Sequence, residues 1–457
     1  MKQYPTRRRF VQLFGASSVA ALAGCSGSDG NGYDSDSPFQ TDEPNSTEAP
    51  TEPGQSESPI FEQTGKMTAS DGDPGDLLGW SVSVSASGGT AVVSAFHDDD
   101  PNGTESGSVY VFTRSSGSWA QQAKLTADDG RVADRFGSSV SITDDGTTAL
   151  IGAHANRNPD GERSGTVYVF SKSGDSWNQQ TKLVANDSED DDAFGSAVSI
   201  AGDGSIAVVG ASNASSSDND GAGSTYMFTR SGDSWSQQAK LQPEDVSNFG
   251  DSVGTSSDGT TAIIGANSDT NANGVNAGSV FVFSRSGDSW TQQAKLTADD
   301  GEAWEEFGGV VEMTDNGTKA IVTIPSDTTP NGERSGSAYI FSRTNGSWEQ
   351  EAKLIPDDGG QGEEFGSAAG ISGDGTTAIV GTSLQAEFTG AAYVYTDATD
   401  GWSQQAKLTP DNAGEDDKFG TSIGISSDGT TAVISADGES EPNGDDSGAA
   451  YAFESPQ

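Results

Sequence analysis

The sequence is poor in the residue types from which many catalytic and metal sites are built. Its 457 residues include one cysteine, Cys25, and two histidines, His97 and His154. A single cysteine cannot form a disulfide bond within the chain. Neither a His/Cys metal cluster nor a Ser-His-Asp triad is recognisable with so few of these residues.

Basic residues are also scarce. The chain has 23 Lys and Arg against 69 Asp and Glu, which gives a formal net charge of -46. Nucleic-acid binding needs Lys and Arg to displace the counterions of the phosphates, so nucleic acid is excluded as a partner. High salt screens the repulsion between so many carboxylates, and the composition therefore predicts a halophilic source.

Long apolar runs are missing as well. The apolar run at 10–23 is shorter than the roughly 20 residues that span a bilayer. It follows TRRRFV (6–11), which resembles the twin-arginine export pattern through Arg7 and Arg8, and it ends in LAGC (22–25), which resembles a lipobox. We therefore expect 1–24 to be a lipoprotein signal peptide and Cys25 to carry the lipid that anchors the exported chain to the outer face of the cell membrane. The Ser-, Pro-, Gly- and acid-rich segment 25–59 is expected to be a disordered tether.

Repetition, by contrast, is abundant. A Phe-Gly or Leu-Gly pair recurs with spacings of 58, 58, 55, 58, 58 and 54 residues. The pairs begin at Leu78, Phe136, Phe194, Phe249, Phe307, Phe365 and Phe419. Such a fixed period indicates a repeat architecture.

Each repeat shows the two-residue periodicity of strands. In the second repeat, SVSI (139–142), TALIGA (148–153), TVYVF (166–170) and WNQQTKL (177–183) are separated by turn or loop residues. The Asp145-Gly146 pair between the first two predicts a tight turn. Four antiparallel strands in each repeat predict the blade of a β-propeller, an all-β fold.

The two ends of the repeat region complement each other. Residues 60–69 match a fourth strand without the three that should precede it, whereas the repeat from Phe419 stops after its third strand. We expect the N-terminal strand to complete the last blade, so that 60–457 forms a closed, seven-bladed, monomeric ring.

Antiparallel order places the short connections on one face of the ring and the long, variable loops on the other. Binding residues commonly lie on variable loops held by a rigid scaffold, so the long-loop face is the candidate binding face. Its loops carry clustered acids that are candidates for a ligand or for Ca²⁺, although plain solvated acid is the favoured explanation in a chain that is acidic throughout. These acids are Asp98, Asp99, Asp100, Asp128, Asp129, Asp190, Asp191, Asp299, Asp300, Asp357 and Asp358.

Two other recurring residues have structural interpretations. A lysine recurs in the fourth strand of every repeat, where it protects an exposed sheet edge from pairing with other chains. A tryptophan that recurs in the same strand is expected to pack at the edge of the blade.

The repeat resembles the FG-GAP repeat of the integrin α-subunit propeller. The resemblance covers about 60–457 and depends on the Phe-Gly pairs, on the Gly-Ala steps such as Gly152-Ala153, and on the following Gly-x-hydrophobic strand. It implies an extracellular seven-bladed propeller that mediates adhesion or ligand binding. The calcium loop common in that family, DxDxDGxxD, is reduced here to ITDDGTTA (142–149), which predicts a turn without calcium.

These observations favour a non-enzymatic binding or adhesion module on the surface of a halophilic archaeon-like cell, with a protein or glycan ligand. The two GxSxG sequences, at Ser252 and Ser422, occupy the start of a strand and not a nucleophile elbow. A carbohydrate-active propeller enzyme and a structural envelope component are the alternatives. Six sequons are candidates for glycosylation, at Asn45, Asn102, Asn186, Asn213, Asn316 and Asn345.

Overall fold

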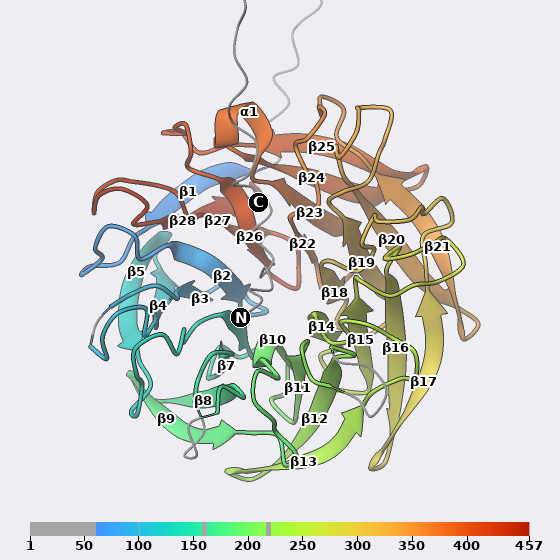
Figure 1. Cartoon of the computed structure of the whole chain (residues 1–457). Helices are drawn as coiled ribbons and strands as arrows, with labels where there is room; N and C mark the ends of the chain where they lie inside the picture. Colours follow the sequence, from blue (N-terminus) through green and yellow to red (C-terminus); the bar gives the residue numbers. More distant parts are fainter. Residues whose placement is uncertain (1–60, 100, 158–161, 216–220, 457) are drawn as a thin grey trace, which may run out of the picture. The chain divides into compact units, whose positions relative to one another are not determined.

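The computed structural model describes residues 61–99, 101–157, 162–215 and 221–456. The predicted signal peptide with Arg7 and Arg8, Cys25, the tether, Asn45 and Asp100 lie outside the described residues. Within them, seven sheets of four antiparallel strands surround a central axis (Figure 1). The predicted all-β, seven-bladed propeller is confirmed.

The two inner strands of each blade are short. The innermost strands are β2 (Leu78–Val84), β6 (Ser139–Ile142), β10 (Phe194–Ile200), β14 (Ser252–Thr255), β18 (Val311–Met313), β22 (Ala368–Ile371) and β26 (Phe419–Ile425). The second strands are β3 (Thr90–Ala95), β7 (Thr148–Ala153), β11 (Ile206–Ala211), β15 (Thr261–Ala266), β19 (Lys319–Ile324), β23 (Thr377–Thr382) and β27 (Thr431–Ala436).

The two outer strands are longer in most blades. The third strands are β4 (Ser108–Ser115), β8 (Thr166–Ser173), β12 (Ser224–Ser231), β16 (Ser279–Ser286), β20 (Ser337–Thr344), β24 (Ala391–Ala398) and β28 (Ala449–Glu454). The outermost strands are β5 (Ser118–Leu125), β9 (Ser176–Leu183), β13 (Ser234–Leu241), β17 (Ser289–Leu296), β21 (Ser347–Leu354), β25 (Gly401–Leu408) and β1 (Glu62–Met67). One short helical turn, α1 (Gln385–Phe388), lies in the loop between β23 and β24. We number the blades 1 to 7 from β2–β5 to β26–β28.

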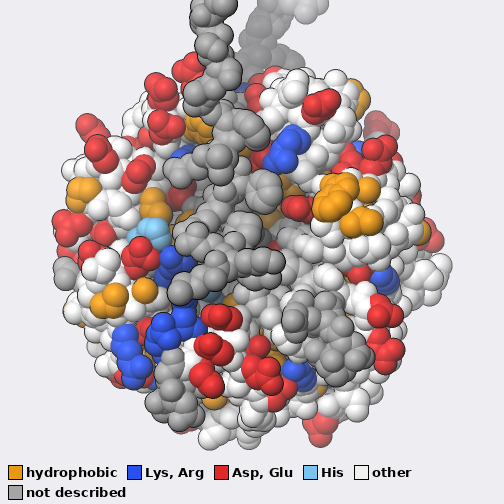
Figure 2. Space-filling model, viewed as in Figure 1, with side chains coloured by type: hydrophobic (Ala, Val, Ile, Leu, Met, Phe, Trp, Pro, Cys, Tyr) orange, Lys and Arg blue, Asp and Glu red, His pale blue; other side chains and the backbone are white. Residues whose placement is uncertain are grey.

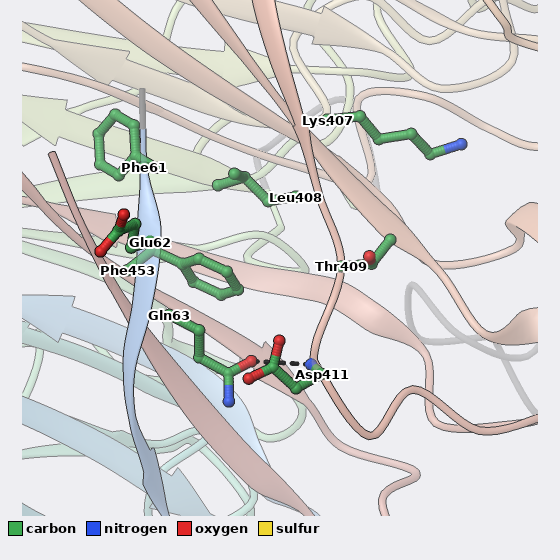
Figure 3. Close-up of a pocket in the computed structure, with 8 residues that line it drawn as sticks. All are labelled: Phe61, Glu62, Gln63, Lys407, Leu408, Thr409, Asp411 and Phe453. Carbon is green, nitrogen blue, oxygen red and sulfur yellow. Dashed lines mark hydrogen bonds between the residues drawn. The ribbon is translucent and has the colours of Figure 1, made fainter. Parts of the chain in front are cut away.

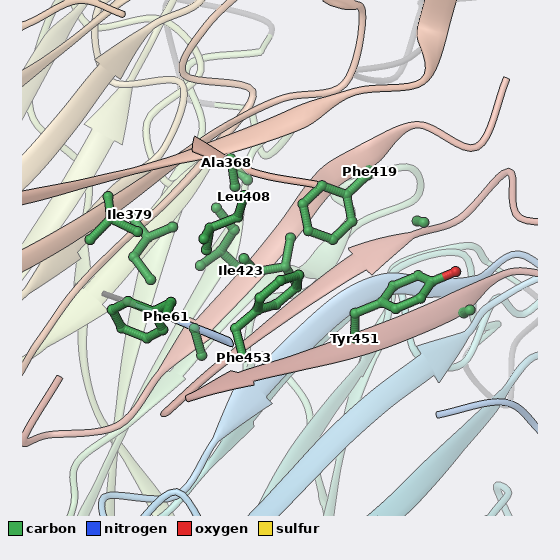
Figure 4. Close-up of a cluster of buried hydrophobic side chains, with 14 residues drawn as sticks. Phe61, Ala368, Ile379, Leu408, Phe419, Ile423, Tyr451 and Phe453 are labelled. Atoms are coloured by element: carbon green, nitrogen blue, oxygen red, sulfur yellow. The ribbon is translucent and has the colours of Figure 1, made fainter. Parts of the chain in front are cut away.

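The N-terminal strand closes the ring as predicted. β1 pairs antiparallel with β28, so blade 7 has the order β1-β28-β27-β26. Phe61, just before β1, is buried in a cluster with Leu408 of blade 6 and Phe453 of blade 7 (Figure 4). The seam is thus held by backbone pairing and by a core shared between two blades.

The hydrophobic core lies between neighbouring blades. In blade 2, the ring of Phe136 meets Tyr168 and Phe170 edge-on, with centroids 5.3 and 5.8 Å apart. The same packing recurs in blades 3 to 7. This is why an aromatic residue opens most repeats.

Glycines allow the blades to approach each other closely. Gly165 forms a parallel bridge with Phe194 of the next blade, has φ +88°, and a Cβ there would lie 2.1 Å from the Phe194 carbonyl oxygen. A Cβ on Gly152 would similarly lie 2.2 Å from the carbonyl oxygen of Gly195. Larger residues at either position would push the blades apart.

Candidate functional site

The short connections of the ring lie on one face and are tied to each other. The Asp145 carboxylate accepts hydrogen bonds from the hydroxyl of Thr143 (2.7 Å) and from the backbone N–H of Thr147 (3.0 Å), which confirms Asp145-Gly146 as a turn. Burial alone would raise the pKa of Asp145, but these hydrogen bonds outweigh it and lower the pKa.

Backbone hydrogen bonds link the turns of neighbouring blades all the way around this face. They begin with Ala86 N–H to the Asp144 carbonyl (3.1 Å) and Asp144 N–H to the Gly202 carbonyl (3.0 Å). They end with Ser427 N–H to the Ala86 carbonyl (3.0 Å), which returns the chain of bonds to blade 1. The short-turn face is therefore a rigid base.

The opposite face is built from the loops between second and third strands and the loops that lead from one blade to the next. These two kinds of loop pair with each other: Ala133 N–H donates to the Thr104 carbonyl and Phe136 N–H to the Ser106 carbonyl, both at 2.9 Å. The Asn102 side chain adds a bond to the Ala127 carbonyl (3.0 Å). The predicted division into a short-turn face and a long-loop face is thus observed.

Exposed apolar side chains gather on the long-loop face. Among the described residues, the exposed large hydrophobics are Val132, Val184, Val275, Trp304 and Phe388. All five lie in loops of this face, and Trp304 is 63% exposed. Its backbone N–H bonds to the Val275 carbonyl (2.9 Å), so the two lie together. Figure 2, which views this face, shows a hydrophobic patch among many acidic side chains.

Each recurring lysine forms a latch that ties the outermost strand of a blade to the loop leading into that blade or to a loop within it. Lys353 on β21 reaches Asp300 in the loop before its blade at 2.6 Å and the buried Asp327 at 2.7 Å. Its ammonium lies 5.1 Å from the centre of the Tyr339 ring, whose hydroxyl donates to Asp300 at 2.9 Å. The sequence interpretation placed these lysines at the sheet edge but missed their carboxylate partners.

Several acids that were candidates for cation binding belong to these latches. Asp129 pairs with Lys182, Asp300 with Lys353, Asp358 with Lys407, and Asp98 with Lys124. Burial alone would raise the pKa of Asp300, but hydrogen bonds from Lys353 and Tyr339 lower it. Asp129 and Asp358 show the same balance and lowered pKa values. These carboxylates already have cationic partners from the chain.

The remaining acidic candidates are exposed and stay apart from the latches. Asp128, Asp299 and Asp357 each precede a latch residue, and the backbone N–H of each donates to a glutamine of the next blade. Asp99 accepts from the Glu105 N–H, Asp190 accepts from the Arg163 N–H, and Asp191 is exposed. Within the described ranges, no group of three or more His, Cys, Asp or Glu side chains is placed to hold a metal ion.

The described sequons occupy different environments. Asn186, Asn213, Asn316 and Asn345 are exposed, whereas Asn102 is partly buried and bonded to the Ala127 carbonyl. Asn316 caps a short turn through hydrogen bonds from Thr314 and Thr318.

The serines of the two GxSxG sequences have structural partners. The buried Ser252 hydroxyl donates to the Gly308 carbonyl of the next blade (2.8 Å), and the Ser422 hydroxyl accepts from the Val82 N–H (3.0 Å). Both therefore join neighbouring blades.

A hollow of about 360 Å³ lies at the seam between blades 6 and 7 (Figure 3). Across it, the Gln63 side chain accepts from the Asp411 backbone N–H at 3.0 Å. The same contact recurs elsewhere in the ring, between Gln179 and Asp128 and between Gln350 and Asp299. The hollow is thus a feature of the blade junction.

One group of rim residues was missed in the sequence. Trp80, at the start of blade 1, packs on Phe96 with ring centroids 3.8 Å apart, and Phe96 lies 4.1 Å from the His97 ring. Ser138 of blade 2 connects this group to its neighbours. Its carbonyl accepts from Trp80 Nε1 (3.2 Å), its hydroxyl from the His154 N–H (3.4 Å), and its own N–H donates to the Arg135 carbonyl (3.1 Å). A comparison of the repeats position by position would have found it.

No helix in the described part of the chain is long and apolar enough to cross a membrane. Comparison with curated proteins gave no match.

The FG-GAP repeat matches the chain seven times, at 61–112, 119–170, 177–228, 235–283, 290–341, 348–395 and 402–453. Each match combines the outermost strand of one blade with three strands of the next, and the first begins at the closing strand β1. The matches cover most of the chain and coincide with its blades, so the chain belongs to the FG-GAP repeat family.

Proposed function

We propose that the protein is a non-enzymatic binding or adhesion module of the cell surface, which presents the long-loop face of its propeller to a protein or glycan ligand. FG-GAP propellers suggest such a ligand-binding or adhesion role in general. The site and the setting described next are our own extension of that role.

The observation that carries the proposal is the one-sided distribution of exposed apolar side chains. Exposed apolar groups that lie together mark interaction surfaces, and Trp304 and Val275 form such a pair. Val132, Val184, Val275, Trp304 and Phe388 all lie on the long-loop face, while the opposite face consists of short turns tied by backbone hydrogen bonds. Variable loops on a rigid base are typical of binding proteins.

Surface display is supported by the position at which the ring begins. Glu62 pairs with Glu454, beside the turn that contains Thr431, so β1 starts at the short-turn end of the ring. A lipid on Cys25 and a tether joined at this end would leave the long-loop face directed away from the membrane.

The proposal is tested by binding of the purified protein to isolated cell envelopes and envelope polysaccharides in molar salt. We expect saturable binding that persists when calcium is chelated, because the latch carboxylates already have lysine partners. Variants Trp304→Ser and Phe388→Ser should weaken it, while Glu349→Gln, an exposed change on β21, should not.

Other outcomes would contradict the proposal. Absence of saturable binding would remove the adhesion role. Shortening of the polysaccharide during incubation would favour a carbohydrate-active enzyme, and loss of binding on chelation would restore calcium to the site.

A further inference from the structure

The rim of the long-loop face differs in one sector from the rest of the ring. At the position of Trp80, the other blades carry Ser138, Ser196, Asp251, Gly309, Ser367 and Thr421. At the position of Phe96, blade 2 has His154 and the others carry Ser212, Asn267, Pro325, Ser383 and Asp437. Aromatic and imidazole rings at these positions are therefore confined to blades 1 and 2.

The Trp80 ring and the backbone around it are held in place before any ligand arrives. Phe96 is 4% exposed and supports the partly exposed Trp80 ring from behind. Ser138 fixes the indole N–H of Trp80 and the backbones of Arg135 and His154 through the three hydrogen bonds described above. A preorganised site loses little conformational entropy on binding.

Arginine is concentrated in the same sector. The repeat region contains nine arginines, and four of them, Arg114, Arg230, Arg285 and Arg343, lie near the ends of third strands. Five arginines lie in the long loops. Arg131 and Arg135 belong to the loop that leads into blade 2, Arg157 and Arg163 to the loop between β7 and β8 of that blade, and Arg334 to blade 5. Figure 2 shows Lys and Arg side chains gathered at the lower left of this face, near a histidine.

Arg135 and Arg163 lie in segments next to His154, because Ser138 bonds to the Arg135 carbonyl and to the His154 N–H, and the Gly165 N–H donates to the Asn156 carbonyl (3.1 Å). Burial, together with these two arginines, lowers the pKa of His154 to about 4. The imidazole is therefore neutral at pH 7 and can both donate and accept a hydrogen bond.

The acids of the sector have partners of their own. Arg135 pairs with Glu105 at 3.1 Å, the Asp190 carboxylate accepts from the Arg163 backbone N–H, and the buried Asp134 binds the Asn156 side chain (2.8 Å). The counterpart of Arg163 in blade 5 is Arg334, which pairs with Glu364. The residue equivalent to Glu364 is Ala193, which cannot form such a pair with Arg163.

We infer that this aromatic–arginine corner, formed by Trp80, Phe96, His97, Arg135, His154 and Arg163, binds an acidic saccharide. The inference rests on the proposed binding function and adds to the same face a site in blades 1 and 2, apart from Trp304 and Phe388, with its ligand class. A sugar ring lies against Trp80, the neutral His154 binds a hydroxyl group, and Arg163 binds the sugar carboxylate through two parallel hydrogen bonds. Aromatic platforms with a few convergent polar groups are typical of small-ligand sites, and the planar guanidinium matches a carboxylate. Arg163 is partly buried, and salt screens a partly buried ion pair less than a fully exposed one.

The test is calorimetric titration of the full-length protein with galacturonic acid oligomers in molar salt. We expect saturable binding, and at least about tenfold weaker binding for Arg163→Gln and for Trp80→Ser, since charge-assisted hydrogen bonds and aromatic contacts are each worth about this factor. Arg334→Gln is the matched control, because it lies in the same GERSG sequence in blade 5, and it should bind as tightly as the unmodified protein. Methyl-esterified oligomers, which lack the charge, should bind at least about tenfold more weakly.

Measurements on the same variants distinguish a failure of this inference from a failure of the proposed function. If envelope binding persists unchanged in Arg163→Gln and Trp80→Ser, the corner is not the binding site, and the adhesion role still stands. Equal affinity for the acidic and esterified oligomers would overturn the carboxylate contact. If an acidic peptide competes with envelope binding and the oligomers do not, the corner binds a protein partner, contrary to our inference. Circular dichroism of each variant verifies that it is folded.

Discussion

At the scale of single residues, the acids of this propeller fall into two kinds: those that form ion pairs within the fold and those that are available for other roles. Asp299 and Asp300 are adjacent and both exposed, yet the Asp300 side chain joins Lys353 and Tyr339 while Asp299 bonds to Gln350 through its backbone N–H. We expect Asp300→Ala to lower the free energy of unfolding by about 1 kcal/mol, the upper range for a partly exposed ion pair, and Asp299→Ala to have little effect. Because the pKa of Asp300 is lowered, its contribution should be present above about pH 4 and be lost as the pH falls further. Denaturant titrations at pH 7 and pH 3 measure both effects; equal losses for the two variants would contradict the latch.

A second residue-scale prediction concerns Glu312. It lies on the innermost strand β18 and is paired with Ile321. The other six blades have a small residue at this position: Ser83, Ser141, Ser199, Gly254, Gly370 and Gly424. Desolvation by the surrounding protein raises the pKa of Glu312 to about 7, although the side chain is exposed to water. A carboxyl group with a raised pKa destabilises the fold progressively as the pH rises from about 4.5 through 7.

Glu312→Gln should therefore stabilise the protein at pH 8 and have little effect at pH 4.5. We expect a gain on the order of 1 kcal/mol at pH 8, well below the full value of the shift because water solvates the group. Unfolding titrations at the two pH values check this, with Glu349→Gln, an exposed acid of the same blade, as the control. A gain of the same size at both pH values would contradict the assignment.

At the scale of elements, the closing strand is the part on which the ring depends. Phe61 packs with Leu408 and Phe453, and β1 supplies the fourth strand of blade 7. We expect Phe61→Ala to cost about 3 kcal/mol, the usual range for removing a buried phenylalanine, and Phe61→Trp, the residue of the other repeats, to be tolerated. Chemical unfolding measures the loss, and an unchanged midpoint in Phe61→Ala would show that closure of the ring does not depend on this side chain.

The strands and their closure could be predicted from the sequence because they depend on local periodicity and on the count of repeated units. The latch could not be predicted from one repeat, because its acid lies in the loop before a blade and its lysine on the last strand of that blade. Asp71 and Lys124, Asp129 and Lys182, Asp187 and Lys240, and Asp300 and Lys353 are all 53 residues apart. The 53-residue spacing is visible in the sequence, but only the folded structure shows that it places a carboxylate beside a lysine. The aromatic–arginine corner was missed for the opposite reason, since it consists of residues that depart from the repeat.

At the scale of the whole molecule, two electrostatic effects oppose each other as salt is added. The latches weaken, but each is a partly exposed pair worth about 1 kcal/mol or less. Repulsion among the carboxylates that give a net charge of -46 also weakens, and it acts over the entire surface. At molar salt the screening length falls to about 3 Å, shorter than most separations between surface charges.

The relief of repulsion should therefore dominate, and the midpoint of thermal unfolding should rise continuously from low salt to molar sodium chloride. Over the same range, the penalty of Asp300→Ala relative to Asp299→Ala should shrink, because the pair it removes is screened. Potassium chloride at equal ionic strength should act like sodium chloride if screening is the cause. A midpoint that is insensitive to salt, or that falls, would mean that the latches outweigh the net charge and that the acidic surface serves some purpose other than stability in brine.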